Sequence, residues 1–401
     1  MDPTLTWIDL TSSDRDKMRR VLDMFTETGT VDEMGLGTLR DTLSDALFPG
    51  TSSIQTRLRY MLFVPWIYKA LEAERVRSED IVRRVRAAEV EVIAPLLRNE
   101  DSDGVIGARA GAAVSRLPSS VYWAGLSRWR IFMPRQSGSW YHANFSSLAH
   151  SQCDTVRTDD PGVSVAGRET WHSRLPKRPG DFPKAVTFAL TREEAEFVRG
   201  RMQEGCPGSL LAWLASEGSA APTSQLWDEP AVQDASAEIQ AAVELARRFS
   251  LLAEGAPLVY NLLLAERRFA LIGNGAERID QYRAELAEWF GREQQEAPFD
   301  AEMLRLFVIR AGGRVPDRQH SFVKAWAART NELRGQDIVP DQTLRKLVEA
   351  RERELKPGGR ARLANPDRLK DWGGRVGVGR MDFRWFRVRQ LLTDLHRGLV
   401  A

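Results

Sequence analysis

The second half of the chain is an almost unbroken series of helix-length amphipathic segments, and this series constrains the fold more than any other feature. Apolar residues recur at steps of three and four in segments 237–254, 257–272, 276–291, 300–312, 318–334, 341–355 and 381–398. Runs of alternating β-branched residues do not exceed about five residues, and the best strand candidate is VTFAL at 186–190. We therefore predict a mainly α-helical, multi-helix globular protein with at most minor β-structure.

The sequence divides into three regions of different character. Residues 1–132 carry capped amphipathic patterns and are predicted to form an N-terminal helical domain. Residues 133–236 hold three of the five histidines and are rich in Ser, Gly and Pro, which predicts a loop-rich middle region with short helices. Residues 237–401 are predicted to form a basic, helical C-terminal domain.

Local signals place several helix ends. Ser12 or Ser13 is expected to cap a helix that runs to about Phe25. Thr191 and Glu194 match a capping box, so a helix is expected to begin there. The last helix has the clearest apolar stripe, which predicts that its residues are buried. The stripe consists of Met381, Trp385, Val388, Leu392, Leu395 and Leu399.

Charge is unevenly distributed along the chain. The formal net charge is only +2, but residues 301–401 contain 22 Lys and Arg against 12 Asp and Glu, whereas residues 1–300 contain 35 against 43. A basic C-terminal quarter on an acidic body indicates an anionic partner. Of the 57 basic residues 49 are Arg, which binds phosphate in a fork geometry. A GC-rich genome, which favours Arg codons everywhere, is the alternative explanation.

Basic and aromatic residues are interleaved near the C-terminus. Four aromatic residues between positions 372 and 386 stand among arginines, a combination typical of nucleic-acid binding. Arg384 and Arg387 are expected to lie side by side on the last helix, with Arg375 and Arg380 on the glycine-rich turn RVGVGR before it. The predicted nucleic-acid contacts are Arg375, Arg380, Arg384, Arg387, Arg360 and Arg362.

Motifs of known cofactor and catalytic sites are missing from the sequence. It has no Walker loop, no dinucleotide-binding fingerprint after a strand, no HExxH and no GxSxG. We therefore expect no cofactor. His142, His150, His172 and Cys153 are zinc-ligand residue types, but their spacing matches no known finger or ribbon, so no metal site is expected.

The Ser- and His-rich middle region nevertheless supports an enzyme as the alternative. Ser139, Tyr141 and His142 can form a nucleophile and base if a carboxylate orients the histidine. The candidate carboxylates are Asp154, Asp159 and Asp160. This arrangement is typical of a hydrolase or nuclease.

A second polar cluster lies in the N-terminal region of the chain and consists of Arg40, Gln55, Arg57, Arg59 and Tyr60. On a helix, Arg57 and Arg59 point about 200° apart and do not line one groove. Internal ion pairs with acids such as Asp41 or Asp45 are the favoured role, and phosphate contact is the alternative.

Two features set the expected location of the protein. No stretch of about 18 apolar residues occurs, so neither a membrane-spanning helix nor a membrane partner is expected. The opening residues MDPTLTWIDLTSSDRDK lack the layout of a secretory signal, and the two cysteines form no CxxC pair. We expect a cytoplasmic protein.

Three stretches resemble one known family. The first is residues 6–72, which begins with TWIDLTSSDRDK and ends with MLFVPWIYKALE. The second is APLVYNLLLAERR at 256–268, and the third is the closing MDFRWFRVRQLLTDLHRGL. By these stretches the chain resembles an uncharacterised bacterial protein family of unknown function. Proteins of that family look like accessory members of defence-island or mobile-element gene neighbourhoods, beside helicases and nucleases. The resemblance implies a DNA-related role and assigns it to no residue.

Three functional hypotheses follow. The first is a non-enzymatic accessory protein in bacterial antiphage defence, which contacts nucleic acid, or a nucleic-acid-processing partner such as a helicase or nuclease subunit, through its basic C-terminal region. The second is a hydrolase or nuclease that uses the Ser- and His-rich middle region. The third is a protein-interaction subunit without nucleic-acid contact, whose acidic body is the interface.

Overall fold

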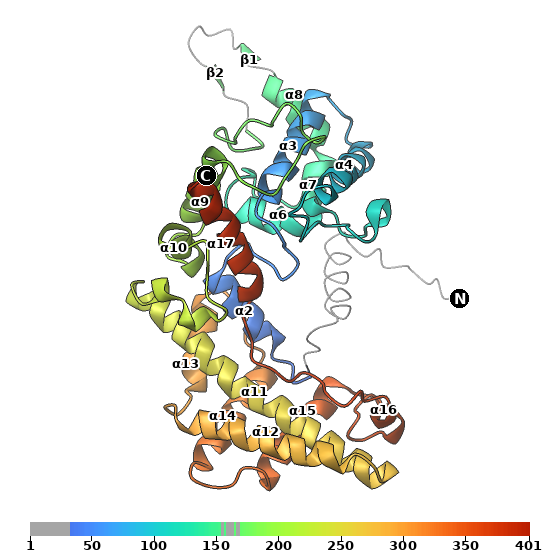
Figure 1. The fold of residues 1–401 in the computed structure, drawn as a ribbon, viewed down its shortest axis with the longest axis vertical. Helices are drawn as coiled ribbons and strands as arrows, with labels where there is room; N and C mark the ends of the chain where they lie inside the picture. Colours follow the sequence, from blue (N-terminus) through green and yellow to red (C-terminus); the bar gives the residue numbers. More distant parts are fainter. Residues whose placement is uncertain (1–32, 154–155, 158–163, 166–168) are drawn as a thin grey trace, which may run out of the picture. The chain divides into compact units, whose positions relative to one another are not determined.

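Helices account for most of the chain, which confirms the predicted fold class. The computed structural model describes residues 33–153, 156–157, 164–165 and 169–401, and 60% of the residues are helical (Figure 1). In this described part, the strands are limited to β1 (Val156–Arg157) and β2 (Ser164–Val165), which pair antiparallel. The predicted helix from Ser12 or Ser13 to Phe25 lies outside the described residues.

The chain divides into two compact units. The first unit consists of the residues up to Arg40 together with Arg248–Met381, and the second unit consists of Asp41–Arg247 together with Asp382–Ala401. The division falls within helices α2 (Gly37–Leu47) and α11 (Ala237–Ile272). The three-part organisation with boundaries after residues 132 and 236 stays a prediction.

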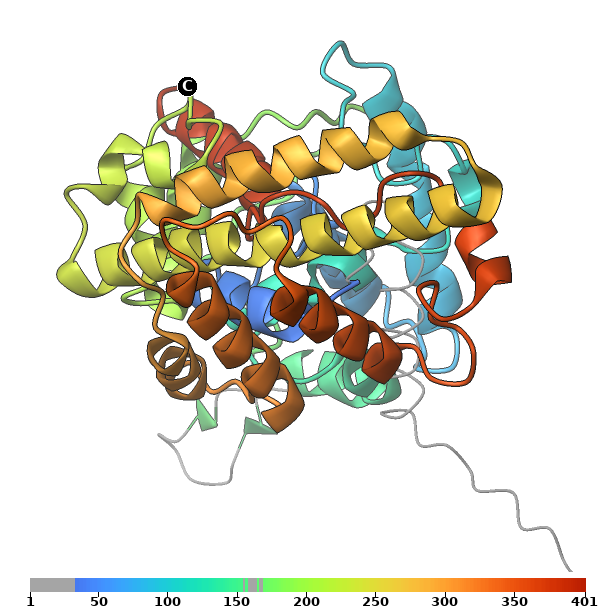
Figure 2. The same cartoon turned by 90° about the horizontal axis from the view of Figure 1, so that it is seen from below.

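Two long helices run antiparallel in the first unit (Figure 1, Figure 2). α11 continues through Pro257, so the two predicted segments 237–254 and 257–272 form one helix. α12 (Ala276–Gln294) returns along it, and Trp289 Nε1 donates to the carbonyl of Leu251 at 2.7 Å. A Cβ on Gly255 would lie 2.3 Å from the Trp289 ring. Only glycine therefore allows the indole to pack this closely against α11.

Shorter helices complete the first unit. Three of them match the predicted segments 300–312, 318–334 and 341–355 to within a few residues, and two of these begin at side-chain caps, Asp300 and Asp341. Trp289 and Trp326 pack in the core with ring centroids 6.1 Å apart. These helices are α13 (Ala301–Arg310), α14 (Asp317–Glu332), α15 (Gln342–Leu355) and α16 (Pro366–Lys370).

Helix α3 (Tyr60–Ala73) is central to the second unit, because almost all of its side chains are buried. Its neighbours are α4, α6 and α8. A helix buried on nearly all sides must be apolar all round, and its sequence, YMLFVPWIYKALEA, is apolar at most positions. The helices of this part of the second unit are α4 (Ile81–Glu91), α5 (Ile93–Leu97), α6 (Pro118–Arg128), α7 (Gly138–Ala143) and α8 (Phe145–Cys153).

A second helix group in this unit joins α9 (Arg192–Gly205), α10 (Leu210–Glu217) and α17 (Trp385–Leu399). The predicted capping box of α9 is confirmed, since Glu194 N donates to Thr191 Oγ1 at 3.2 Å and Thr191 N donates to Glu194 Oε2 at 3.0 Å. The predicted stripe of the last helix is buried at its central positions. Short 3₁₀ helices occupy Gly111–Ala113, Leu226–Asp228 and Pro230–Val232.

The predicted strand at 186–190 is wrong. Val186, Phe188 and Leu190 are buried and alternate with exposed residues, as the pattern required. However, this segment pairs with no strand in the part of the chain that the structure describes, and the carbonyl of Val186 accepts a hydrogen bond from Asn99 Nδ2 at 2.7 Å. The alternation therefore reflected one-sided burial against helices and not a sheet.

Candidate functional site

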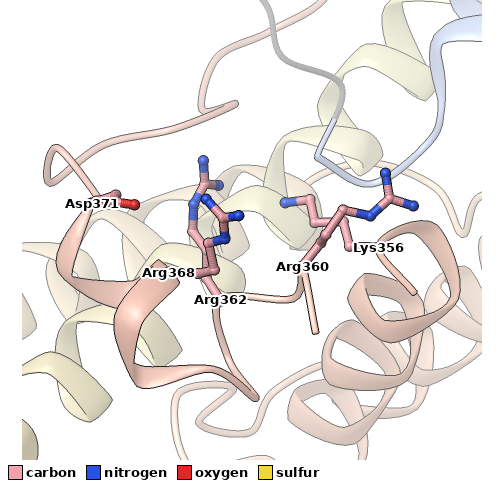
Figure 3. Close-up of a pocket in the computed structure, with 5 residues that line it drawn as sticks. All are labelled: Lys356, Arg360, Arg362, Arg368 and Asp371. Atoms are coloured by element: carbon pink, nitrogen blue, oxygen red, sulfur yellow. The ribbon is translucent and has the colours of Figure 1, made fainter. Parts of the chain in front are cut away.

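A pocket of about 300 Å³ opens in the first unit, and cationic side chains form most of its lining (Figure 3). Three of the cationic residues belong to the loop between α15 and α16, and the fourth lies on α16. Figure 3 shows the side chains of Arg362 and Arg368 pointing the same way. The lining residues are Lys356, Arg360, Arg362, Arg368 and Asp371. We call this cavity the basic pocket.

The local sequence explains why the loop has this shape. Gly358 and Gly359 have φ angles of +68° and +77°, values that residues with a Cβ adopt at an energetic cost, so the chain turns between Lys356 and Arg360. Asn365 then caps α16 and also donates from Nδ2 to the carbonyl of Gly359 at 2.7 Å. The loop is thus held at both ends.

A buried carboxylate fixes the middle of the loop. Glu352 has a fully buried side chain, and its two oxygens accept from the backbone N–H groups of Arg362 and Leu363 at 2.8 and 3.0 Å. Tyr260 donates to the same carboxylate at 2.5 Å. Burial and the neighbouring carboxylate raise the pKa of Tyr260 above its ordinary value, so it remains a donor.

A second buried carboxylate, Glu33, neutralises two of the pocket's cations. Arg362 Nη1 donates to Glu33 Oε1 at 2.9 Å, and Lys356 donates to the other oxygen. Burial alone would lower the pKa of Arg362, but its hydrogen bonds with Glu33 and Tyr260 raise it. Arg362 therefore stays charged, and an internal anion already holds it together with Lys356.

The other two cations of the pocket have no such partner. Arg360 is exposed, and its hydrogen bond goes to the carbonyl of Pro357 at 3.1 Å. Arg368 is exposed and makes no hydrogen bond or ion pair with any residue that the structure describes. These two guanidinium groups are therefore available to an external anion.

The structure separates the six predicted arginines. Arg360 and Arg362 meet in the basic pocket. Arg375 also belongs to the first unit, but both oxygens of Glu285 accept from its Nη1 at 2.9 Å. Arg380 is half-buried in the same unit. The remaining two, Arg384 and Arg387, belong to the second unit.

The expectation that Arg384 and Arg387 lie side by side on the last helix is wrong for Arg384. That residue has a φ angle of +70° and precedes the helix, which begins at Trp385. Its Nη1 donates to Asp45 at 2.5 Å and to the carbonyl of Thr51 at 3.0 Å. Arg387 donates to the carbonyl of Ser53 at 3.0 Å. Both guanidinium groups bind acceptors of their own unit.

Sequence reasoning missed Lys356 and left Arg368 out of the predicted contacts. A signal for the basic pocket was present in KPGGRAR at 356–362, where a Pro-Gly-Gly turn brings basic residues together. The similar string RVGVGR supplied the predicted contacts Arg375 and Arg380 instead. The sequence offered no way to tell which individual arginines of these two loops are neutralised by distant acids.

Two arginines of the N-terminal polar cluster, Arg57 and Arg59, form the internal ion pairs that were the favoured role. Arg57 donates from Nε to Asp394 at 3.0 Å and from Nη2 to Asp101 at 2.6 Å. Arg59 donates to Glu194 at 2.8 Å. The partners are not the expected Asp41 and Asp45, because residues 48–59 are not helical and the acids come from distant parts of the second unit.

Comparison with known proteins identifies the family of the chain. The model of a family of unknown function, DUF6361, matches residues 3–398. The chain belongs to DUF6361. No match was found among curated proteins or among solved structures.

In this DUF6361 chain, His142 has a tyrosine as its partner. Its Nε2 lies 2.6 Å from the Tyr68 hydroxyl, and burial lowers the pKa of the imidazole. Tyr141 is buried and donates to Glu72. Ser139 is exposed and has no contact with His142. The expected orienting carboxylates, Asp154, Asp159 and Asp160, lie outside the described residues.

The other metal-ligand residue types are dispersed. His172 packs against Phe197, with ring centroids 5.6 Å apart. His150 and Cys153 lie on α8. In the ranges that the structure describes, no group of three or more His, Cys, Asp or Glu side chains is placed to hold a metal ion. Likewise, no helix among the described residues combines the length and the apolar character needed to cross a membrane.

Proposed function

We propose that this DUF6361 protein is a non-enzymatic, cytoplasmic accessory protein that binds nucleic acid by its phosphate backbone through the basic pocket. The observation that supports the proposal most directly is the pair of exposed guanidinium groups, Arg360 and Arg368, which no described carboxylate neutralises. The resemblance to proteins of bacterial defence neighbourhoods adds antiphage defence as the proposed setting.

The physical argument starts from the ligand. A phosphate diester is a permanent anion, and Arg binds it with two parallel N–H groups. The pocket supplies four cationic side chains, of which Glu33 neutralises two, and one lining carboxylate, Asp371. The described lining of this pocket includes no Asn or Gln that could read a base edge, so we expect the basic pocket itself to bind phosphate independently of sequence. Displacement of counterions from the strand then supplies most of the binding free energy.

The test is a fluorescence-anisotropy titration of labelled single-stranded and duplex DNA at two salt concentrations. The wild type is compared with the Arg360→Ala/Arg368→Ala variant. Two lost phosphate contacts should weaken binding about tenfold or more at low salt. They should also make the slope of log K against log salt less negative by about 0.7 per contact on a single strand and about 0.9 per contact on a duplex.

A matched control removes the same charge elsewhere in the first unit. Arg305→Ala/Arg310→Ala changes two arginines of α13 that do not line the pocket, and it should bind like the wild type. If the wild type does not bind DNA at low salt, or if both double variants lose the same affinity, the basic pocket is not the contact and the proposal is wrong.

One observation favours a partner protein as a second candidate function. Helix α13 exposes Met303, Leu306 and Ile309, with 54%, 47% and 50% of their surfaces accessible. Such a group of apolar side chains on one exposed helix is typical of a protein interface. Met303→Asp/Ile309→Asp should abolish co-purification with a helicase or nuclease subunit, the class of partner proposed here. Unchanged co-purification would contradict this role for α13.

A further inference from the structure

A second cavity adjoins the basic pocket in the first unit. It has a volume of about 450 Å³, within the range of small-ligand sites. Asp371 lines the basic pocket and Trp372 lines this second cavity. Because consecutive Cα atoms are about 3.8 Å apart, one stretch of backbone contributes to the lining of both cavities.

The chemistry of the second cavity differs from that of the basic pocket. Its polar lining consists of Arg268, Asn274, Glu277 and Arg278. Arg268 already donates to the carbonyl of Trp372. The remaining groups combine an amide, a carboxylate and a guanidinium, which together offer both donors and acceptors. A carboxylate at this place repels a phosphate and suits the exocyclic amine of a base.

The planar guanidinium group of Arg278 lies beside Trp372 and Gly374. Its Cζ lies 5.9 Å from the ring centroid of Trp372, and a Cβ on Gly374 would lie 1.3 Å from its Nη1. Gly374 has a φ angle of +98°. Glycine is therefore required at this position for two reasons, the backbone angle and the lack of space for a Cβ. The guanidinium group of Arg278 makes no hydrogen bond with any described residue. Its N–H groups and one guanidinium face can therefore serve a ligand.

We propose that the second cavity is a nucleobase subsite. A single strand would place a phosphate in the basic pocket and an adjacent base against Arg278, with Asn274 and Glu277 at the base edge. Planar arginines stack on unpaired bases in this way. A duplex keeps its bases stacked inside the helix, so the strand bound here is single. This inference rests on the proposed nucleic-acid function and adds the class of ligand.

The test separates base recognition from phosphate contact. The probes are a labelled deoxycytidine strand and a strand of equal length in which every base is replaced by an abasic tetrahydrofuran residue. The wild type should bind the deoxycytidine strand about tenfold more tightly than the abasic strand, because stacking of one base contributes about this much. Arg278→Ala should bind both strands at the abasic level.

Two variants control for charge and for folding. Arg283→Ala removes an arginine from the same helix that lies outside the cavity, and it should keep the tenfold preference. Arg278→Lys keeps the charge but loses the planar surface, so it should lose the preference while its binding of the abasic strand is unchanged. Circular dichroism melting curves show whether each variant is folded.

The carboxylate gives a second readout. A thymidine strand offers no exocyclic amine to Glu277, so the wild type should bind it more weakly than the deoxycytidine strand, and Glu277→Ala should reduce this difference.

Each outcome bears on one of the two proposals. Equal wild-type binding of deoxycytidine and abasic strands would overturn the base subsite and leave the phosphate pocket standing. If Arg278→Ala lost affinity equally for both strands, Arg278 would contact phosphate and not a base. This result would also overturn the base subsite. No binding of any strand would overturn the proposed function itself, and the subsite with it.

Discussion

Two loops of the C-terminal quarter have similar sequences and different electrostatics. KPGGRAR at 356–362 and RVGVGR at 375–380 are both rich in glycine and arginine. In the second loop Arg375 is neutralised by Glu285. In the first loop Arg360 has a carbonyl as its hydrogen-bond acceptor. The number of arginines in a loop therefore says little about binding, because what matters is whether an acid of the same unit neutralises them.

This comparison predicts that neutralised arginines contribute to stability, whereas arginines without an acid contribute to binding. The largest effect is expected for Arg57, whose side chain is only 5% exposed between Asp101 and Asp394. Arg57→Ala leaves the buried Asp394 without its cation and should cost about 3–5 kcal/mol of unfolding free energy. Urea denaturation measures this loss. A loss below about 1 kcal/mol, the range of a surface pair, would contradict the stabilising role assigned to neutralised arginines.

The reverse case is a buried acid that lacks an arginine. Glu89 accepts from Ser119 N and Oγ, and burial raises the pKa of its carboxyl to about 7. The folded protein therefore holds this proton more tightly than the unfolded chain. Its stabilising contribution is complete below the unfolded pKa of 4.5 and is lost as the pH rises through about 7, up to about 3 kcal/mol.

Glu89→Gln tests this pH dependence. The variant should show a flatter dependence of the unfolding free energy on pH between about 4.5 and 7. Chemical denaturation at several pH values measures the difference between the two proteins. Parallel curves would show that Glu89 has an ordinary pKa in the folded protein.

Glu33 offers a way to convert a neutralised site into a free one. Glu33→Gln removes the anion that Lys356 and Arg362 share. Arg362 then becomes available to phosphate, whereas Lys356 keeps its ion pair with Glu352 at 3.7 Å. Single-stranded DNA should bind about fivefold to tenfold more tightly, and the salt slope should become more negative by about 0.7 per added contact. The matched control is Glu302→Gln on α13, away from the pocket. Unchanged affinity for Glu33→Gln would contradict competition between Glu33 and the ligand.

The smallest effect is expected for Arg384. Its partner Asp45 has a side chain that is 65% exposed, and solvent screens such a pair, so Arg384→Ala should cost about 1 kcal/mol or less. Its DNA affinity should equal that of the wild type, in contrast to the sequence-based expectation. A clear drop in affinity in the anisotropy titration would place Arg384 back among the contacts.

Helix positions were predictable because they depend on local patterns. The stripe of the last helix buried Trp385 as expected, and the Thr191–Glu194 capping box marked the start of α9. Predictions from local patterns were wrong where one sequence pattern is compatible with two different structures. The alternation at 186–190 gave one-sided burial without a strand, and the predicted helix over 381–398 begins only at Trp385, because Phe383 and Arg384 have positive φ angles.

The fold class, many helix positions and the basic character of the C-terminal quarter follow from the sequence alone, because apolar periodicity, caps and charge counts are properties of short stretches. The free arginines could be identified only in the folded chain. Arg362 meets Glu33 across 329 residues of sequence, and Arg384 meets Asp45 across 339. An ion pair forms between side chains that the folded backbone brings together, so its partners cannot be read from their spacing along the chain.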